Sequence, residues 1–428
     1  MSEVLPVSAR VEQGRLVLGG IAATELAERY GTPLYVYCER TLRERTRAYL
    51  AGLEFYPGAA RAAFACKANA TVGVLRVILS EGLGADVASA GELAAAALAG
   101  ADPAGLIVHG NNKSDADLEA AIGAGAGLLV LDHAEEPVRV ERLAAAHGRV
   151  QQVAVRVTPG IDADTHHKIR TGHGTSKFGL APPDALDALD RVAALPHLHP
   201  AGLHVHLGSQ IADTGAYERA IDWLCSFIEQ HGLGELPLLD LGGGLGIAHV
   251  EQEPAPDVEQ AVELVCLHLA ERLIGHGLPF PELILEPGRS ICGPAGVTLY
   301  TVGAIKQTAG GVVHAAVDGG MSDNPRPALY GARYQALACD RAGADPDHRY
   351  HVSGKHCESG DVLIEDAWLP ELAIGDVLCV PATGAYAASM ASTYNMLPRP
   401  AAVLVGDGDA GLIQRRETID DLLTREQD

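Results

Sequence analysis

The chain has 428 residues, of which 47% are hydrophobic, and a formal net charge of −23 at pH 7. Excess acidic groups repel phosphate backbones and anionic headgroups, so the charge argues against binding to nucleic acid or to a membrane surface. The length exceeds the roughly 250 residues usual for a single α/β barrel, which predicts a second domain.

The N-terminal residues have neither the positive flank nor the apolar core of a signal peptide, and no uncharged run approaches the length of a membrane span. The eight cysteines, from Cys38 to Cys379, show no CxxC pair and no metal-type spacing. We therefore expect free thiols in a reducing compartment, and a cytoplasmic protein.

In chain order, a short strand at 15–18 comes first, ahead of the turn at 31–33. Eight short apolar runs follow, each ending in polar or glycine-rich residues, and segments such as 115–121, 184–194 and 258–276 between them have helical apolar spacing. This alternation predicts a parallel (β/α)₈ barrel of the TIM type. The eight runs are the one that ends at Lys67, then 84–89, 105–111, 127–132, 153–159, 202–209, 236–244 and 283–290.

After about residue 295 the helical spacing gives way to strand-like runs at 297–307, 312–317, 349–353, 361–368, 376–380 and 401–405. These predict a C-terminal antiparallel β domain that also takes in the N-terminal segment. The expected division is an N-terminal segment at 1–32, the barrel at 33–295 and the β domain at 296–428.

Lys67 stands at the carboxyl end of an apolar run, in the sequence Phe64-Ala65-Cys66-Lys67-Ala68-Asn69. The chemistry of a barrel is located at the carboxyl ends of its strands, so this lysine is expected to face the site, where its amine can form an imine. Polar residues at strand ends also cap the helices that follow, which is the alternative for any single position.

Residues at two later strand ends are candidates for binding an anion and a cofactor ring. The run Asp240-Leu241-Gly242-Gly243-Gly244 lets backbone N–H groups approach a phosphate, although tight turns use glycine without a ligand. The run Glu286-Pro287-Gly288-Arg289-Ser290 places a carboxylate where it can hold a protonated ring nitrogen, unless Glu286 and Arg289 form only a structural ion pair.

The run 202–210 places His204, His206 and Gly208 on one face of a strand by alternation. The His206 imidazole can lie flat on a cofactor ring and Ser209 can donate to its phosphate, although a core histidine is the commoner case. No metal site is expected, because His166, His167 and His173 lie in a polar loop without ligand spacing.

The motifs GADVASAGEL at 84–93, HGNNKS at 109–114, TGHGTSKFGL at 171–180, DGGMSDNPRPALY at 318–330 and GKHCESGD at 354–361 follow the lysine in order. Over nearly its whole length the chain resembles the fold-type III pyridoxal-phosphate decarboxylases, and among them the bacterial diaminopimelate decarboxylases. The resemblance implies decarboxylation of meso-2,6-diaminopimelate to L-lysine and CO₂, the last step of lysine biosynthesis.

The resemblance also implies individual roles in holding pyridoxal 5′-phosphate. Lys67 forms the imine, His206 stacks on the ring, and Glu286 binds the ring nitrogen. We also expect Asp86 and Arg156, at neighbouring strand ends, to position the lysine and the ring hydroxyl, unless either forms only an ion pair of the barrel. The residues implied in binding the phosphate group and its surroundings are Ser209, Gly243, Gly244, Gly288, Arg289 and Tyr386.

For the substrate, the resemblance implies that Cys357 returns a proton to the decarboxylated carbon, and that Cys357 and Glu358 come from the neighbouring subunit of a head-to-tail homodimer. The acidic neighbours Glu358 and Asp361 favour the thiol form of the cysteine. Arg289, Arg326 and Tyr330 match the contacts to the distal carboxylate, Glu358 matches the contact to the distal ammonium, and Tyr386 also lines the substrate site.

Two alternatives stay open. One is another fold-type III enzyme, such as an ornithine or arginine decarboxylase or an alanine racemase, although a racemase favours a cation where Glu286 stands. The other is a protein that carries the cofactor without catalysis, which should have lost Lys67 or Cys357. The loop at 166–177 is expected to be a lid.

Overall fold

The computed structural model describes residues 4–161 and 176–427, and it divides into two compact units. The barrel unit comprises Arg45–Gly246 and Ala255–Ser290. The β unit comprises the chain up to Glu44, the segment Ile247–Pro254 and the chain from Ile291 onward. The predicted lid residues 166–175, including the three histidines of that loop, lie outside the described residues.

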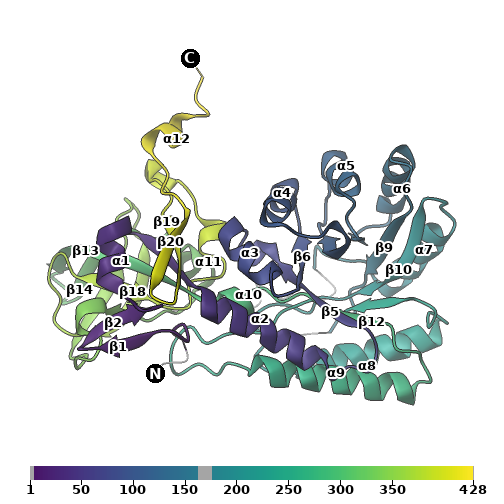
Figure 1. The fold of residues 1–428 in the computed structure, drawn as a ribbon, viewed down its shortest axis with the longest axis horizontal. Coiled ribbons are helices and arrows are strands. Elements are labelled where there is room, and N and C mark those ends of the chain that lie inside the picture. Colours follow the sequence, from purple (N-terminus) through teal and green to yellow (C-terminus); the bar gives the residue numbers. More distant parts are fainter. Residues whose placement is uncertain (1–3, 162–175, 428) are drawn as a thin grey trace. The chain divides into compact units, whose positions relative to one another are not determined.

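The eight predicted strands of the barrel unit close into a parallel barrel in the order β10-β11-β12-β5-β6-β7-β8-β9 (Figure 1), so the predicted barrel is confirmed. Each run is parallel to its neighbours because a helix returns the chain between strands. The strands are β5 (Ala60–Ala65), β6 (Gly84–Val87), β7 (Leu106–Val108), β8 (Leu128–Leu131), β9 (Gln151–Arg156), β10 (Leu198–His204), β11 (Leu238–Asp240) and β12 (Glu282–Leu285).

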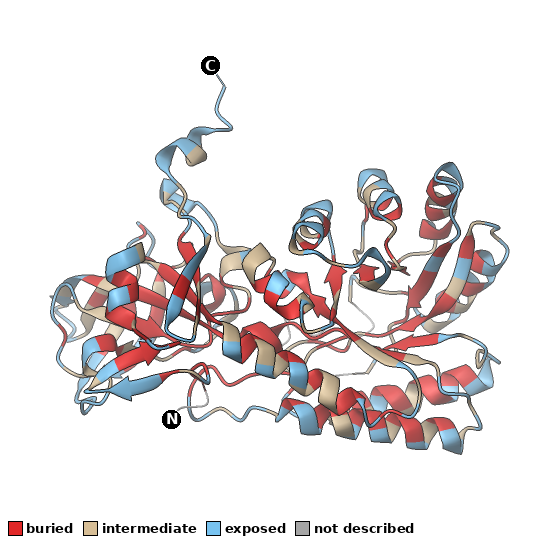
Figure 2. Ribbon diagram, viewed as in Figure 1, coloured by how far each residue is buried: buried red, intermediate tan, exposed pale blue. Residues whose placement is uncertain are grey.

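Helices cover the outside of the barrel, and their ends follow ordinary capping rules. Ser114 caps α5 in a reciprocal capping box with Asp117, and the helix ends at the left-handed Gly125. Figure 2 shows their buried inner faces and exposed outer faces. The helices are α2 (Glu39–Leu53), which begins in the β unit, α3 (Val72–Leu79), α4 (Ala90–Ala99), α5 (Asp115–Ala124), α6 (Glu136–Ala146), α7 (Pro182–Ala193), α8 (Gly215–Gln230) and α9 (Val258–Gly275).

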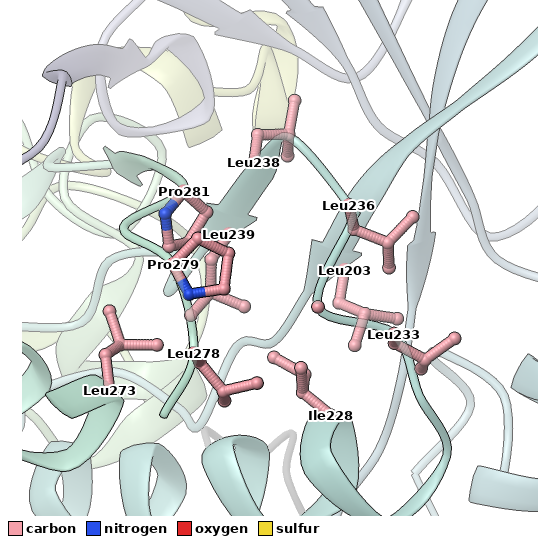
Figure 3. A pocket seen from close by; sticks show the side chains of 11 residues that line it. Leu203, Ile228, Leu233, Leu236, Leu238, Leu239, Leu273, Leu278, Pro279 and Pro281 are labelled. Atoms are coloured by element: carbon pink, nitrogen blue, oxygen red, sulfur yellow. The ribbon is translucent and has the colours of Figure 1, made fainter. Parts of the chain in front are cut away.

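The inside of the barrel is filled by side chains. Alanine, valine, leucine and isoleucine side chains from seven of the eight strands form a packed core rather than a pore. A separate small cavity, of about 10 Å³, lies among apolar side chains of β10, β11 and the helices α8 and α9, which pack beside each other (Figure 3). It is apolar and no larger than a water molecule, so it cannot hold a cofactor. The buried barrel core comprises Ala63, Ile107, Leu128, Val130, Ala154, Ala201, Leu238 and Ile284.

The β unit contains a mixed sheet in the order β17-β16-β14-β13-β4-β19-β20, with β18 also paired to β13 and β15. The predicted β domain with its N-terminal contribution is confirmed, but β14 with β16 and β19 with β4 are parallel pairs, so the sheet is not purely antiparallel. The strands are β4 (Leu34–Cys38), β13 (Gly296–Gln307), β14 (Val313–Val317), β15 (Leu337–Ala338), β16 (His348–Ser353), β17 (Val362–Leu369), β18 (Val377–Val380), β19 (Ala401–Gly406) and β20 (Asp409–Gln414).

Strand β4 is buried at every residue and lies between β13 and β19, although the sequence assigned this stretch to the barrel segment. A separate three-stranded sheet precedes it, followed by α1 (Ala23–Tyr30). The division at residues 32 and 295 stays a prediction. The remaining elements are β1 (Arg10–Glu12), β2 (Arg15–Leu18), β3 (Ile21–Ala22), α10 (Arg289–Cys292), α11 (Arg326–Tyr330) and α12 (Ile419–Leu423).

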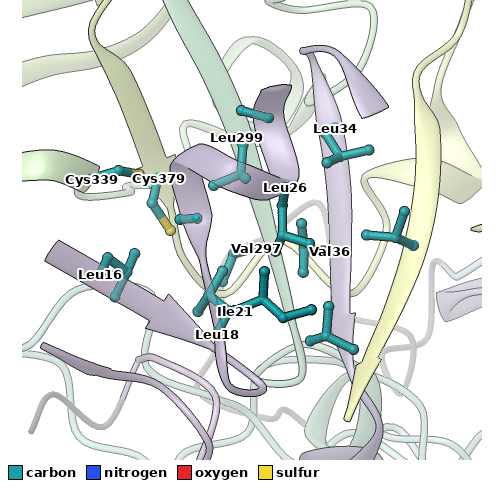
Figure 4. Packing of buried hydrophobic residues seen from close by; sticks show 14 of the residues in the cluster. Leu16, Leu18, Ile21, Leu26, Leu34, Val36, Val297, Leu299, Cys339 and Cys379 are labelled. Carbon is teal, nitrogen blue, oxygen red and sulfur yellow. The ribbon is translucent and has the colours of Figure 1, made fainter. Parts of the chain in front are cut away.

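The apolar core of the β unit joins the N-terminal strands to the C-terminal ones. Leu16, Leu18 and Ile21 pack with Leu34 and Val297 in one buried cluster (Figure 4). Burial of these large apolar side chains away from water stabilises the folded state by roughly 1.5–3 kcal/mol for each side chain. The N-terminal segment is therefore an integral part of the β unit.

Candidate active site

The carboxyl ends of the barrel strands bring the predicted cofactor residues of the barrel unit to one edge. Lys67 lies on a 3₁₀ turn, Cys66–Ala68, directly after β5, and its side chain is exposed. Its positive charge lowers the pKa of His206 and acts on Asp86 and Glu92 as well. The amine is therefore close enough to interact electrostatically with residues at or just after the carboxyl ends of β6 and β10.

Gly288 supports the loop that carries Lys67. The backbone N–H of Ala65 donates to the carbonyl of Pro287 over 2.9 Å. A Cβ added at Gly288 would lie only 3.0 Å from the Cβ of Ala68 and 3.2 Å from that of Ala65. A larger residue would push against the lysine loop, which gives the glycine of this motif a packing reason.

Glu286 follows β12 and is the centre of a buried polar cluster. Its Oε1 lies 2.5 Å from Nε2 of His109, and its Oε2 lies 3.2 Å from Nε2 of His204. Burial opposes the ionisation of Glu286, but the two imidazoles outweigh it and hold its pKa well below the ordinary value. The carboxylate is therefore ionised, as a partner of a protonated ring nitrogen must be.

Asp86 and Asp240 respond to the same cluster in the opposite direction. Burial raises the pKa of Asp86 to about 6, with His109 and Lys67 opposing the rise and Glu286 adding to it. Burial, together with the charge of Glu286, raises the pKa of Asp240 well above the ordinary value. Glu286 is therefore the acidic group of the cluster that ionises most readily.

Arg156, at the end of β9, is buried and lies 3.7 Å from the carboxylate of Asp132. Its guanidinium also lies over the ring of Phe178, at 4.7 Å from the ring centroid. Burial lowers its pKa, while Asp132 and Glu286 raise it. It supplies a fixed positive charge behind the cluster.

His206 is tied to the glycine turn. The backbone N–H of Gly243 donates to its Nδ1 over 3.3 Å, so this nitrogen carries a lone pair. Burial and the charges of Lys67 and Arg156 lower the pKa of His206 well below its ordinary value. A neutral imidazole can lie on a cationic ring without charge repulsion.

The glycine turn itself has no room for side chains. A Cβ at Gly243 would overlap the carbonyl oxygen of Glu286, and the carbonyl of Gly243 accepts a hydrogen bond of 2.8 Å from the Tyr217 hydroxyl. Nearby, Arg289 donates to the hydroxyl of Ser209 over 3.0 Å. A guanidinium, a hydroxyl and glycine backbone together suit a phosphate group.

The other predicted residues lie in the β unit, which is described by itself. Arg326 is buried, and its Nη1 lies 2.7 Å from Nε2 of His249 and 2.6 Å from the Tyr334 hydroxyl. Tyr330 is half-buried at the end of α11. His249 and Tyr334 thus position Arg326. Neither residue was predicted from the sequence, because no motif links them to Arg326.

Cys357 and Glu358 are exposed on one loop of the β unit. The side-chain oxygen of Asn395 accepts the N–H of Cys357 over 3.0 Å. Asp361, the other acidic neighbour of the cysteine in the sequence, is buried, and its carboxylate lies 2.7 Å from Nδ1 of His356. Its role in the structure is to hold the loop that carries Cys357.

Tyr386 is half-buried and has a backbone φ of 61°. A bulky residue in this left-handed region is strained by about 1–3 kcal/mol, and such strain is concentrated at functional sites. The strain agrees with the contact role predicted for Tyr386 without testing it.

The comparisons with known proteins agree with this geometry. Residues 39–293 match the family model for the pyridoxal binding domain of pyridoxal-dependent decarboxylases. The diaminopimelate decarboxylase of Actinosynnema pretiosum subsp. auranticum is 45% identical, over 98% of this chain and 94% of the relative. The chain belongs to the diaminopimelate decarboxylase family.

Solved structures of relatives extend the comparison to the fold of the enzyme. The diaminopimelate decarboxylase from M. jannaschii, in complex with L-lysine, has a TM-score of 0.91 and 31% identity, covering 98% of each chain. The lysine/ornithine decarboxylase from Vibrio vulnificus, in complex with putrescine, has a TM-score of 0.74 and 25% identity over 90% of this chain and 97% of its own. The family model makes pyridoxal 5′-phosphate the cofactor of the enzyme.

The barrel residues fit that cofactor. Glu286 is an ionised acceptor, Arg289 and Ser209 adjoin the glycine turn, and Lys67 lies beside the same edge. His109, His204 and Asp240 were not among the predicted site residues. Their positions at the ends of β7, β10 and β11 were the available signal, because side chains there converge in a barrel.

The same cluster has the composition of a metal site. Ligand atoms of His109, His204, Asp240 and Glu286 all lie within 4.8 Å of one another. In the structure both imidazoles already contact Glu286 through Nε2, so we interpret the cluster as hydrogen-bonded. The prediction that the enzyme uses no metal stays untested. Across the described residues, no helix is both long and apolar enough to cross a bilayer.

Proposed function

We propose that this enzyme decarboxylates meso-2,6-diaminopimelate at its D-configured end and releases L-lysine and CO₂, the last step of lysine biosynthesis. The observation that carries the proposal is the ionised Glu286 at the same strand-end edge as Lys67, in a member of this family. Bound pyridoxal phosphate supplies an aldehyde that condenses with amines and a ring that accepts the electron pair left by departing CO₂.

The residues that hold the cofactor would then divide its binding among them. Lys67 would hold the cofactor covalently through its side-chain amine. His206 lies against the ring, and Asp86 with Arg156 positions the lysine. Gly243, Gly244, Gly288, Ser209, Arg289 and Tyr386 hold the phosphate.

The ionised Glu286 would favour a protonated ring nitrogen, which would make the bound ring a better electron acceptor. This preference supports decarboxylation over racemisation, because a racemase needs the carboxylate to stay attached while the carbon exchanges a proton.

Most of the residues proposed to contact the substrate belong to the β unit. The thiol of Cys357 delivers the proton to the carbon that has lost CO₂. Arg326, Tyr330 and Arg289 bind the distal carboxylate, to which Tyr386 is adjacent, and Glu358 binds the distal ammonium. Guanidinium groups that pair with a carboxylate disfavour ornithine, which lacks that group.

We further propose a head-to-tail homodimer in the cytoplasm, in which Cys357 and Glu358 serve the site of the neighbouring subunit. The exposure of both residues in the single chain supports this assembly, because a proton donor must be closed off from water when it works. None of the eight cysteines forms a disulfide in the structure, which supports a reducing compartment.

The test is a product assay with meso-diaminopimelate, ornithine, arginine and L-alanine as separate substrates. We expect CO₂ and lysine from diaminopimelate and at least a hundredfold lower kcat/KM for the others, since an unpaired buried guanidinium costs about 3 kcal/mol. Faster turnover of another amino acid would overturn the substrate assignment.

The covalent role of Lys67 is tested separately. Borohydride reduction should attach the cofactor to the wild-type enzyme and not to Lys67→Ala. Lys306→Ala removes an exposed lysine from β13 and serves as the matched control, which should still be labelled. Labelling of Lys67→Ala at the wild-type level would assign the link to another amine.

A further inference from the structure

Two histidines approach Glu286 from different sides of the barrel. His109 directly follows β7 and reaches Oε1 at 2.5 Å, whereas His204 ends β10 and reaches Oε2 at 3.2 Å. In the closed strand order, β10 lies two strands to one side of β12 and β7 lies three strands to the other. Both oxygens of the carboxylate are therefore held, one from each side of β12.

The proton positions follow from the partners of each ring nitrogen. An ionised carboxylate only accepts hydrogen bonds, so each Nε2 that contacts it carries the proton. The Nδ1 atom of His204 is buried and has no hydrogen-bond partner in the part of the chain that the structure describes. An N–H there would be buried unpaired, which assigns the neutral Nε2–H tautomer to His204. Burial also lowers the pKa of His204 to about 3.

Other titratable groups also surround Glu286. Burial and the charge of Glu286 raise the pKa of Asp240 well above its ordinary value, and in its protonated form this acid can also donate to Glu286. Asp86 carries negative charge of its own above a pKa of about 6. The rings of His109 and His204 also contact each other, with centroids 4.7 Å apart. The charged or titratable groups that face this cluster from the other strand ends are Lys67, Asp86, Arg156, His206 and Asp240.

We propose that His109 and His204 are positioning residues, which hold both oxygens of Glu286 so that it stays ionised and aimed at the ring nitrogen of pyridoxal phosphate. The inference rests on the proposed function and adds the residues that set the protonation of the cofactor ring. A protonated Glu286 would donate to the ring nitrogen instead of accepting from it, and the neutral ring would take up electrons less readily.

The test separates the donor hydrogen bond from simple packing. His109→Leu and His204→Leu each remove one donor, whereas His109→Gln and His204→Gln keep an N–H near the Nε2 position. The readout is the nitrogen-15 NMR signal of ring-labelled pyridoxal phosphate bound to each protein, across the pH range in which the proteins stay folded. This signal reports the protonation of the ring nitrogen directly and does not depend on turnover.

We expect a protonated nitrogen in the wild type and in both glutamine variants, and a shift toward the neutral signal in both leucine variants. With Glu286 more easily protonated, the leucine variants should lose activity first at the acidic side of the pH profile. We expect kcat to fall roughly 10- to 100-fold while KM changes little, as for other residues that orient a catalytic group.

His197→Leu is the matched control, because His197 precedes the first residue of β10 and its Nδ1 lies 2.8 Å from Oε1 of Glu141. It removes another imidazole–carboxylate contact at the far end of the strand that carries His204, and should leave the nitrogen signal unchanged. His109 is the less buried of the pair, so its leucine variant keeps the test available if His204→Leu fails to fold.

A nitrogen that stays protonated in the leucine variants, with kcat within twofold of the wild type, would overturn the inference and leave the proposed function intact. A wild-type protein that binds no pyridoxal phosphate would instead overturn the proposed function.

Discussion

Asp240 and Gly242 are joined by a hydrogen bond of 2.8 Å, in which the backbone N–H of Gly242 donates to Oδ1 of Asp240. Gly242 has a φ of 67°, and its carbonyl accepts the N–H of Glu286 over 2.8 Å. The left-handed backbone lets the chain turn back at this point, which few side chains would allow. The proposed phosphate turn and the residue proposed for the ring nitrogen are thus parts of one hydrogen-bonded unit.

Loss of the Asp240 side chain should therefore weaken cofactor binding. In Asp240→Ala the turn loses its anchor, and we expect the dissociation constant of pyridoxal phosphate to rise about tenfold, which is the contribution of one hydrogen bond. Asp240→Asn keeps the acceptor and resembles the protonated acid favoured at this position, so it should bind within about twofold of the wild type. Fluorescence titration of the cofactor-free proteins measures both. Equal affinity for the alanine variant and the wild type would contradict the prediction.

The buried pair of Lys113 and Glu136 should contribute strongly to stability once formed. Their charged atoms lie 2.7 Å apart, and both side chains are almost fully buried. Lys113 also donates to the carbonyls of Gly110 and Val130. Removal of one partner leaves a buried charge, so we expect Lys113→Met or Glu136→Leu to lower the free energy of unfolding by about 3–5 kcal/mol.

The double variant Lys113→Met with Glu136→Leu should recover a large part of that loss, because neither charge remains. Urea unfolding followed by circular dichroism gives all four values. Arg40→Ala breaks an exposed pair with Glu44 and should change the midpoint hardly at all. A double variant as unstable as the sum of the single variants would show that the pair is not the cause.

Asp86 should make the stability of the cofactor-free enzyme depend on pH. Burial raises its pKa from 3.8 to about 6, so the folded state favours the protonated acid. The associated stability is fully present below pH 3.8 and is lost as the pH rises through 6. At about 1.4 kcal/mol for each pH unit between the two values, the loss at neutral pH is ~3 kcal/mol.

Asp86→Asn cannot ionise, so its free energy of unfolding relative to the wild type should increase between those pH values and then level off. Chemical denaturation at several pH values measures this difference. Asp366→Asn changes an exposed carboxylate on β17 and should show no such increase. A constant difference between Asp86→Asn and the wild type across the range would refute the prediction.

Arg326 should determine the preference for a substrate with a distal carboxylate. We expect Arg326→Ala to lower kcat/KM for diaminopimelate on the order of 10- to 100-fold, mostly through KM, since a hydrogen bond to a charged group contributes about 1.5–3 kcal/mol. Arg326→Lys keeps the positive charge but lacks the planar guanidinium that can donate two parallel hydrogen bonds. It should therefore recover only part of the lost kcat/KM. Steady-state kinetics of both variants provide the measurement.

Arg341→Ala is the control for this substitution, because it removes an arginine of the same unit that pairs with Asp376. Its kcat/KM should stay at the wild-type value. If Arg326→Ala retained full kcat/KM for diaminopimelate, the distal carboxylate would need another partner.

The barrel was predictable because each of its strands is a local pattern. An apolar run that ends in polar residues and is followed by helical spacing identifies a βα unit, and eight such units close in only one common way. The placement of Lys67 and Glu286 at strand ends follows from the same pattern. Their roles with the cofactor came from the resemblance of the motifs, and they stay predictions for this chain.

By itself, the sequence determined the βα repeat, the residues available at each strand end and the family to which the motifs point. Tertiary structure decided that β4 lies between β13 and β19, and that His109 meets Glu286 across a separation of 177 residues. The physical reason is that these contacts depend on where the closed sheets place distant strands and on which way each end side chain turns. The protonation of the cluster followed only then, since burial and neighbouring charges exist only in the folded chain.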